Sequence, residues 1–195
     1  MPNHCESDLL VTGPSGELKR FMEFAKGSAG VDNPREGETA TEALLSAGRF
    51  IPYPAEFKTG QQCPQCGWTS AEEPQERGFG VRCPTCAVFT QDGYNRGGYE
   101  WCVKNWGTKW GLYEVRLENQ DTFEDPEEHG SLEYSFQSAW SPPGLVIKEM
   151  GRQFPLLAFD LSYYECGAAY QGKLLVEGGE VKSQWSGEYH GNRGG

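Results

Sequence analysis

Residues 105–117 read NWGTKWGLYEVRL and join the richest side-chain chemistry of the chain to the start of a strand. Two tryptophans, a lysine and two glycines lead into a run that alternates from Trp110 to Leu117, and a period of two indicates a half-buried strand. Other stretches also place Trp, Cys, Glu or His at an expected strand end. They are PNHC at 2–5, AWSPP at 139–143 and YYECG at 163–167.

The same alternation predicts further strands on either side of this stretch. Apolar residues two apart mark strands over about residues 5–12, 132–140 and 157–163, and LLVEGGEV at 174–181 predicts a hairpin through Gly178 and Gly179. The last ten residues, 186–195, contain no such pattern and are expected to be a flexible tail.

Apolar residues three and four apart predict helices after the strands at 5–12 and 132–140. Ser15 is the expected cap of the first helix, which ends at Gly27. Ser141 is the expected cap of the second, where two prolines favour a helix start, and that helix ends before Pro155. A capping-box pattern also predicts a short helix from Thr39 to about residue 47. A further short helix is expected within NRGGYEWCVKNWG at 95–107.

This order predicts an α+β fold, a ferredoxin-like split βαββαβ antiparallel sheet with both helices on one face and a C-terminal hairpin. Residues 1–59 and 93–185 would form this domain, and 60–92 an inserted zinc ribbon. In that topology the first two strands begin where the last two end. One rim of the sheet would then collect distant residues, namely Asn3, His4, Cys5, residues 106–110, Trp140, Ser141, Tyr164, Glu165 and Cys166.

Charge bounds the possible partners. The chain of 195 residues has 17 basic and 28 acidic side chains, a formal charge of −11. Attraction to nucleic acid phosphates is mostly electrostatic, so this balance favours instead a protein partner with a basic surface. No stretch approaches the ~20 apolar residues of a membrane span, and the N-terminus lacks a signal-like pattern. A cytoplasmic location is expected.

The cysteines give the strongest chemical signal. Two Cys-x-x-Cys pairs, CPQC and CPTC, have sixteen residues between them, and they supply Cys63, Cys66, Cys83 and Cys86. Four thiolates at this spacing are typical of a tetrahedral structural Zn²⁺ site, which leaves no open position for water. A redox pair or disulfides are the alternatives, and the odd total of seven cysteines fits a reducing compartment better. The zinc would shape a surface bearing Trp68 and Phe79.

The rim has two interpretations. In the first, its tryptophans are core aromatics with a lysine stem lying over them, which is the commonest use of such residues. Alternatively the rim is a binding surface, because tryptophan is enriched at interaction hot spots. The residues of that candidate site are Asn105, Trp106, Lys109, Trp110, Trp140 and Glu165.

Two further function classes each require particular residues. A rim enzyme would need His4, Glu165 and the thiols of Cys102 and Cys166 to meet, and no motif places a nucleophile beside a base; Cys5 is expected to be buried. RNA binding on the open sheet face would need exposed aromatic residues, whereas the first and third strands offer carboxylates there. The insert is also acidic, with Glu72, Glu73 and Glu76 against Arg77 and Arg82.

The opening MPN-x-C with LLVTGP, the central NWGTKW, the AWSPP turn and the Tyr164-Glu165-x-Gly167 end resemble the YubB ferredoxin-like domain family of bacteriophage and plasmid proteins. The resemblance covers residues 1–24 and 98–172. His4 stands where that family usually has tryptophan and Cys166 where it usually has proline, and the cysteine insert lies outside its common core. The resemblance implies the fold and a phage or plasmid setting, and it implies no activity.

Together these observations predict a phage- or plasmid-borne accessory protein with a structural zinc that binds a host protein, for example to inhibit a defence system. An enzyme with its site at the rim and a nucleic-acid-binding module remain the alternative hypotheses.

Overall fold

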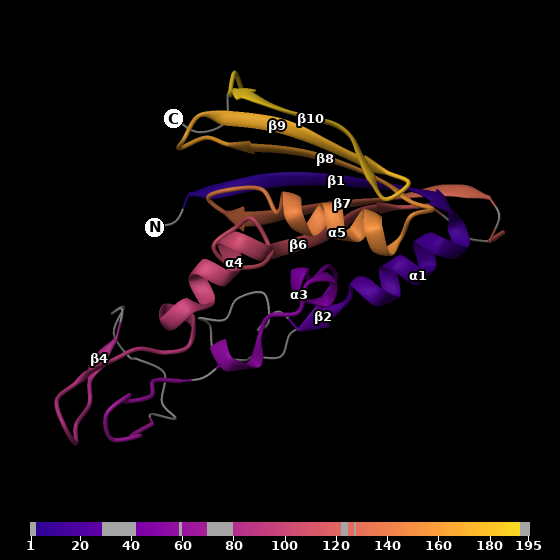
Figure 1. The fold of residues 1–195 in the computed structure, drawn as a ribbon. Coiled ribbons are helices and arrows are strands. Elements are labelled where there is room, and N and C mark those ends of the chain that lie inside the picture. Colours follow the sequence, from indigo (N-terminus) through magenta and orange to yellow (C-terminus); the bar gives the residue numbers. More distant parts are fainter. Residues whose placement is uncertain are drawn as a thin grey trace.

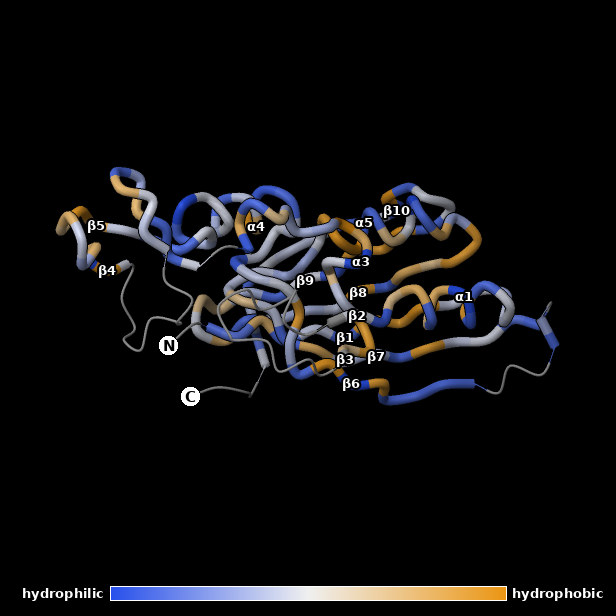
Figure 2. The backbone as a smooth tube through the Cα atoms, turned by 90° about the horizontal axis from the view of Figure 1, so that it is seen from below, coloured by the Kyte–Doolittle hydropathy of each residue, from blue (hydrophilic) through white to orange (hydrophobic). Residues whose placement is uncertain are grey.

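The computed structural model describes residues 3–28, 42–58, 60–69, 80–121, 125–126 and 128–191. Their main feature is a six-stranded antiparallel sheet with the helices gathered on one face (Figure 1). Cysteine pairs and short strands form a separate projection at one end of the molecule, and both views place it away from the sheet (Figures 1 and 2). The predicted α+β architecture is confirmed.

Four strands and two helices reproduce the predicted ferredoxin-like order along the chain. They are β1 (His4–Pro14), α1 (Ser15–Ala25), β6 (Tyr113–Gln120), β7 (His129–Ala139), α5 (Gly144–Gln153) and β8 (Ala158–Glu165). In the sheet they lie in the order β8-β1-β7-β6, so the first strand is central and both of its neighbours run antiparallel to it. β9 (Tyr170–Glu177) and β10 (Glu180–Glu188) extend the sheet beyond β8.

Shorter elements connect α1 to β6. In chain order they are β2 (Gly27–Ser28), β3 (Glu42–Ala43), α3 (Ala47–Phe50), the 3₁₀ helix η1 (Ala55–Phe57), β4 (Val81–Arg82), β5 (Phe89–Thr90), the π-helical turn η2 (Tyr94–Gly98) and α4 (Tyr99–Asn105). α4 is the short helix expected within 95–107.

The core lies between the helices and the covered sheet face. Along β1 the residues Cys5, Leu9 and Val11 are fully buried, because alternate side chains of a strand point to the same face. Phe21 of α1 lies at the centre of an aromatic group, packed edge-on against Phe154 and Phe159. Burying a side chain of this size contributes roughly 1.5–3 kcal/mol relative to exposure.

Helix α5 approaches the sheet closely at a glycine. A Cβ atom added at Gly151 would lie 2.3 Å from Cγ1 of Val176 on β9. Because any larger residue would push the helix away from β9, the glycine sets the depth at which α5 packs.

The structure corrects three local predictions. Residues 39–41 lie outside the described residues, Glu42 and Ala43 pair with β2, and α3 begins at Ala47 where the predicted helix was to end. The second strand begins at Tyr113, because residues 106–110 form a turn. Ser15 is the first residue of α1 and makes no side-chain cap.

The expected flexible tail is partly ordered. β10 continues to Glu188, and the backbone N–H of Tyr189 donates a 2.9 Å hydrogen bond to the carbonyl of Ala169. The Tyr189 ring also stacks on Tyr164 with the centroids 5.2 Å apart. Pairing with β9 therefore holds residues 186–189 in place.

Candidate functional site

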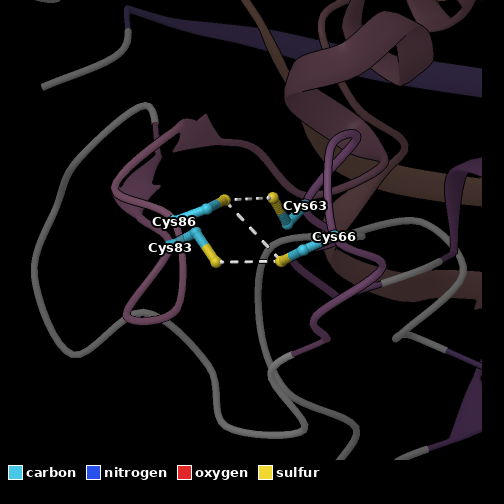
Figure 3. Close-up of side chains that lie close together, drawn as sticks. All are labelled: Cys63, Cys66, Cys83 and Cys86. Atoms are coloured by element: carbon cyan, nitrogen blue, oxygen red, sulfur yellow. Dashed lines mark hydrogen bonds between the residues drawn. The ribbon is translucent and has the colours of Figure 1, made fainter.

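The four cysteines of the two Cys-x-x-Cys pairs form one cluster (Figure 3). The sulfurs of Cys63 and Cys86 are 3.4 Å apart, as are those of Cys66 and Cys83, and all four lie within 4.8 Å of one another. Tetrahedral thiolate sites with ~2.3 Å metal–sulfur bonds place their sulfurs ~3.8 Å apart, whereas a disulfide needs ~2.05 Å. All seven cysteines are free thiols. The cluster could therefore hold a metal ion.

Each cysteine pair lies in a turn of the same design. The N–H of Gly67 donates to the carbonyl of Cys63 at 3.0 Å, and that of Ala87 donates to Cys83 at 2.8 Å. The residue after each second cysteine has a positive φ, +74° at Gly67 and +58° at Ala87. Two equivalent turns face each other and present two sulfurs each.

Backbone groups favour the thiolate form of the first cysteine in each pair. Burial raises the pKa of the Cys83 thiol, but the N–H groups of Cys86 and Thr85 donate to its sulfur and bring that pKa down to about 6. The pKa of Cys63 is also lowered: burial opposes this, and the N–H groups of Cys66 and Gln65 outweigh it. Because a metal binds thiolates, these donors prepare the cluster for one.

The two turns give opposite predictions for exchanging their residues. Ala87→Gly should stabilise the insert by up to about 1 kcal/mol, because glycine adopts a positive φ without the steric cost of a Cβ. Gly67→Ala should destabilise it by about 1–2 kcal/mol from backbone strain alone, since an added Cβ there meets no atom within 4 Å. Competition with a chromogenic chelator would measure both, and shifts of the same sign would contradict the prediction.

The insert joins the core through a tight neck. A Cβ added at Gly93 would lie 2.4 Å from the carbonyl oxygen of Phe57, and one added at Gly98 would lie 1.9 Å from the Tyr53 hydroxyl. The two glycines therefore let the returning chain press against the outgoing one. Tyr94, the residue after Gly93, is buried and donates a 3.1 Å hydrogen bond from its hydroxyl to the carbonyl of Lys109.

The strand ends meet at one rim, as the topology predicted. The N–H of Trp140 donates to the carbonyl of Asn3 at 3.0 Å, and the Asn3 amide donates to Glu165 Oε2 at 3.3 Å. The Thr108 hydroxyl donates to the carbonyl of Ala139 at 2.9 Å. Segments from four distant parts of the chain therefore lie side by side.

Within this rim, Trp106 belongs to the core. Its side chain is fully buried, its Nε1 donates to the carbonyl of Ile51 at 2.8 Å, and its ring packs against Tyr53 and Trp101. Asn105 donates from its side chain to the carbonyl of Trp101 at the end of α4. The prediction that Trp106 lines a binding surface is wrong, because the segment before the insert covers it.

Glu165 is also committed to the fold. Only 2% of the residue is exposed, and its carboxylate accepts hydrogen bonds from the backbone N–H groups of Gly167, at 2.7 Å, and Ala168. With the Asn3 amide as a third donor, the buried charge is well satisfied. Its evident role is to hold the turn between β8 and β9.

The accessible part of the rim is built on Lys109 and Trp140. The Lys109 ammonium lies 4.2 Å from the Trp140 ring centroid and 5.9 Å from that of Tyr99. Trp140 is 41% exposed and has φ +70°, a conformation that a bulky residue rarely adopts. Trp110 is half-buried, and its ring centroid lies 6.4 Å from that of Tyr113. Tyr99 was missed from the sequence, because only the turn of the chain after α4 brings it here.

Of the residues considered for catalysis, His4 contacts a tyrosine and one of the candidate thiols, Cys102, lies in the core. His4 Nδ1 lies 2.8 Å from the Tyr113 hydroxyl, on the open side of the sheet. Cys5 and Cys102 are both fully buried, and burial raises the pKa of Cys5 to about 11. Burial of Cys5 was expected from the alternation of β1.

The open sheet face is acidic at its centre. Cross-strand pairing places Leu10 of β1 between Glu133 of β7 and Asp160 of β8. Shallow depressions of about 300 and 340 Å³ are lined by these and other side chains, among them Glu6, Asp8, Glu114, Arg116, Glu118 and Lys173. Six of the charged side chains here are acidic and two are basic.

Aromatic residues flank this acidic centre. Trp185 of β10 is 49% exposed and pairs across the strands with Lys173, and Tyr164 of β8 pairs with Glu6. The prediction for the open sheet face rested on the first and third strands, and it missed both rings because they lie on other strands. Both rings lie on the β8–β10 side of the face, so the centre of the face is still acidic.

Part of the sheet is similar to a domain of known proteins. Residues 113–192 match the model of the ferredoxin-like domain in Api92-like protein. The crystal structure of protein Api92 from Yersinia pseudotuberculosis is similar, with 11% sequence identity and a TM-score of 0.49 over 98% of this chain and 99% of that chain. No curated protein matches the chain.

The Api92-like match runs from β6 through β10. It therefore includes two of the four rim segments, those around Trp140 and Glu165, and leaves out both cysteine pairs and NWGTKW. In the described residues, no helix is both long enough and apolar enough to cross a membrane.

Proposed function

We propose that this chain is a zinc-containing accessory protein of a phage or plasmid that acts in the bacterial cytoplasm by binding a host protein. The partner presents a basic surface, and a defence protein that is inhibited by the contact fits this description. The carboxylates at the centre of the open sheet face are the observation that carries the proposal.

Zinc is proposed as the metal because of its ligands and their spacing. Four cysteine sulfurs at tetrahedral separations are the ligand set of structural zinc sites. Four thiolates complete the coordination, so the metal would bind no substrate. Its role would be to fold an insert that has few buried side chains of its own.

A partner with a basic surface is proposed because of the charge on the open sheet face. Glu6, Asp8, Glu133 and Asp160 lie together in the middle of the face, whereas the basic residues lie toward its sides. This arrangement repels phosphate and attracts lysine and arginine side chains, and such charge complementarity raises association rates and selects partners.

Neutralising the face tests the proposal. The triple variant Asp8→Asn, Glu133→Gln and Asp160→Asn should lose a protein partner that the wild type captures from bacterial lysate at low salt. The matched control Glu23→Gln, Glu100→Gln and Glu180→Gln changes the net charge equally with exposed carboxylates of α1, α4 and β10, and should retain that partner. Raising the salt concentration should weaken capture. Recovery of nucleic acid without protein would defeat the proposal.

A further inference from the structure

The rim carries an ammonium group that no carboxylate neutralises among the described residues. The contacts recorded for the Lys109 side chain are the rings of Trp140 and Tyr99. A ring face attracts a cation but accepts its hydrogen bonds only weakly, so the ammonium keeps N–H groups available. In a chain of charge −11 this is an unusual place for an unpaired cation.

Trp140 next to it is held in a costly conformation without being buried. Its φ of +70° is strained for a residue with a large side chain. Hydrogen bonds to Asn3 and from the Tyr170 hydroxyl, the latter 2.7 Å long, hold its backbone on both sides. The residue is not buried, because 41% of it is exposed. Stability alone does not explain a tryptophan here.

An exposed apolar side chain lies beside the turn that carries Lys109. Leu145, the second residue of α5, is 40% exposed, and its Cγ lies 3.7 Å from where a side chain of Gly107 would begin. Gly107 in turn accepts a 2.6 Å hydrogen bond from the hydroxyl of Ser141, the residue after Trp140. Exposed apolar groups around a tryptophan are typical of contact sites.

We propose that Lys109, Trp140 and Leu145 form an anchoring site for a carboxylate that stands beside an apolar side chain on a protein partner. The carboxylate pairs with the Lys109 ammonium, and the apolar group covers the Trp140 ring and Leu145. The site lies at the strand ends, apart from the acidic sheet face. It rests on the proposed function only in taking the ligand to be part of a protein.

N-acetyl-leucine is a suitable probe, and its amide is the uncharged match. In an NMR titration the acid should shift the indole N–H resonance of Trp140, assigned by its loss in Trp140→Gly, with a Kd on the order of a few millimolar. The amide should bind about tenfold more weakly. Lys109→Met should remove the difference between acid and amide, Lys109→Arg should keep it, and Lys104→Met on exposed α4 is the matched control.

Trp140→Gly separates binding from packing. Glycine adopts φ +70° without strain, so Tm should stay within about 3 °C of the wild type. N-acetyl-leucine should no longer shift the backbone amide resonances around Lys109, which report binding in this variant. A larger fall in Tm, or retained binding, would show that Trp140 serves packing. Equal binding of acid and amide to the wild type, or shifts confined to other tryptophans, would overturn the anchoring site. Because no lysate is involved, failure here leaves the sheet-face test unaffected.

Discussion

Replacing Cys63 by serine is expected to abolish metal binding and unfold residues 60–92, while the six-stranded sheet stays folded. In the described part of the insert the strands are two residues long, and Cys63 and Cys83 lie outside the main core cluster. With zinc bound as proposed, the insert would depend on the metal, whose binding in such sites is worth about 10–16 kcal/mol at pH 7. Losing one of four ligands removes most of that free energy.

Metal content and local protection measure this result. The wild type should contain close to one zinc per chain by mass spectrometry, and Cys63→Ser close to none. Hydrogen exchange should become fast in 60–69 and 80–92 and stay slow in β1 and β7. Cys166→Ser, a half-buried cysteine outside the cluster, should keep the metal. Undiminished zinc in Cys63→Ser, or loss of the sheet together with the insert, would contradict the assignment.

Trp106→Ala is expected to lower the free energy of unfolding by about 3–5 kcal/mol, the range for removing a fully buried large aromatic side chain. The substitution leaves a cavity beside Tyr53 and Trp101 and also leaves the carbonyl of Ile51 without its donor. Urea unfolding followed by circular dichroism would measure the change.

Trp140→Gly provides the contrast for Trp106→Ala, because both remove a tryptophan from neighbouring rim segments. Trp140→Gly should change the free energy of unfolding little, whereas Trp106→Ala should lower it severely. Similar losses for both variants would mean that the rim is a continuous packed core, and the distinction between its buried and accessible residues would fall.

Much of the sheet could be predicted from local patterns. Alternation along β1, β7 and β8 marked their buried faces, and the order of strands and helices predicted that their ends share a rim. The pattern could not separate Trp106 from Trp140. Trp106 lies in a turn without periodicity, whereas alternation placed Trp140 in the strand over 132–140, which in the structure ends at Ala139. For neither residue do the neighbours in sequence determine what covers the ring. The order in residues 186–189 was missed for a similar reason, because it comes from pairing with β9.

By itself, the sequence determined the sheet order and the cysteine cluster. A period of two needs only the strand itself, and each Cys-x-x-Cys turn orients its sulfurs through hydrogen bonds between residues at most five apart. Only the tertiary structure decided which rim residues are accessible. Burial depends on chain segments such as Ile51–Tyr53, which reach Trp106 from more than fifty residues away. Trp140 has no such segment over it among the described residues, and its ring stays open beside Lys109.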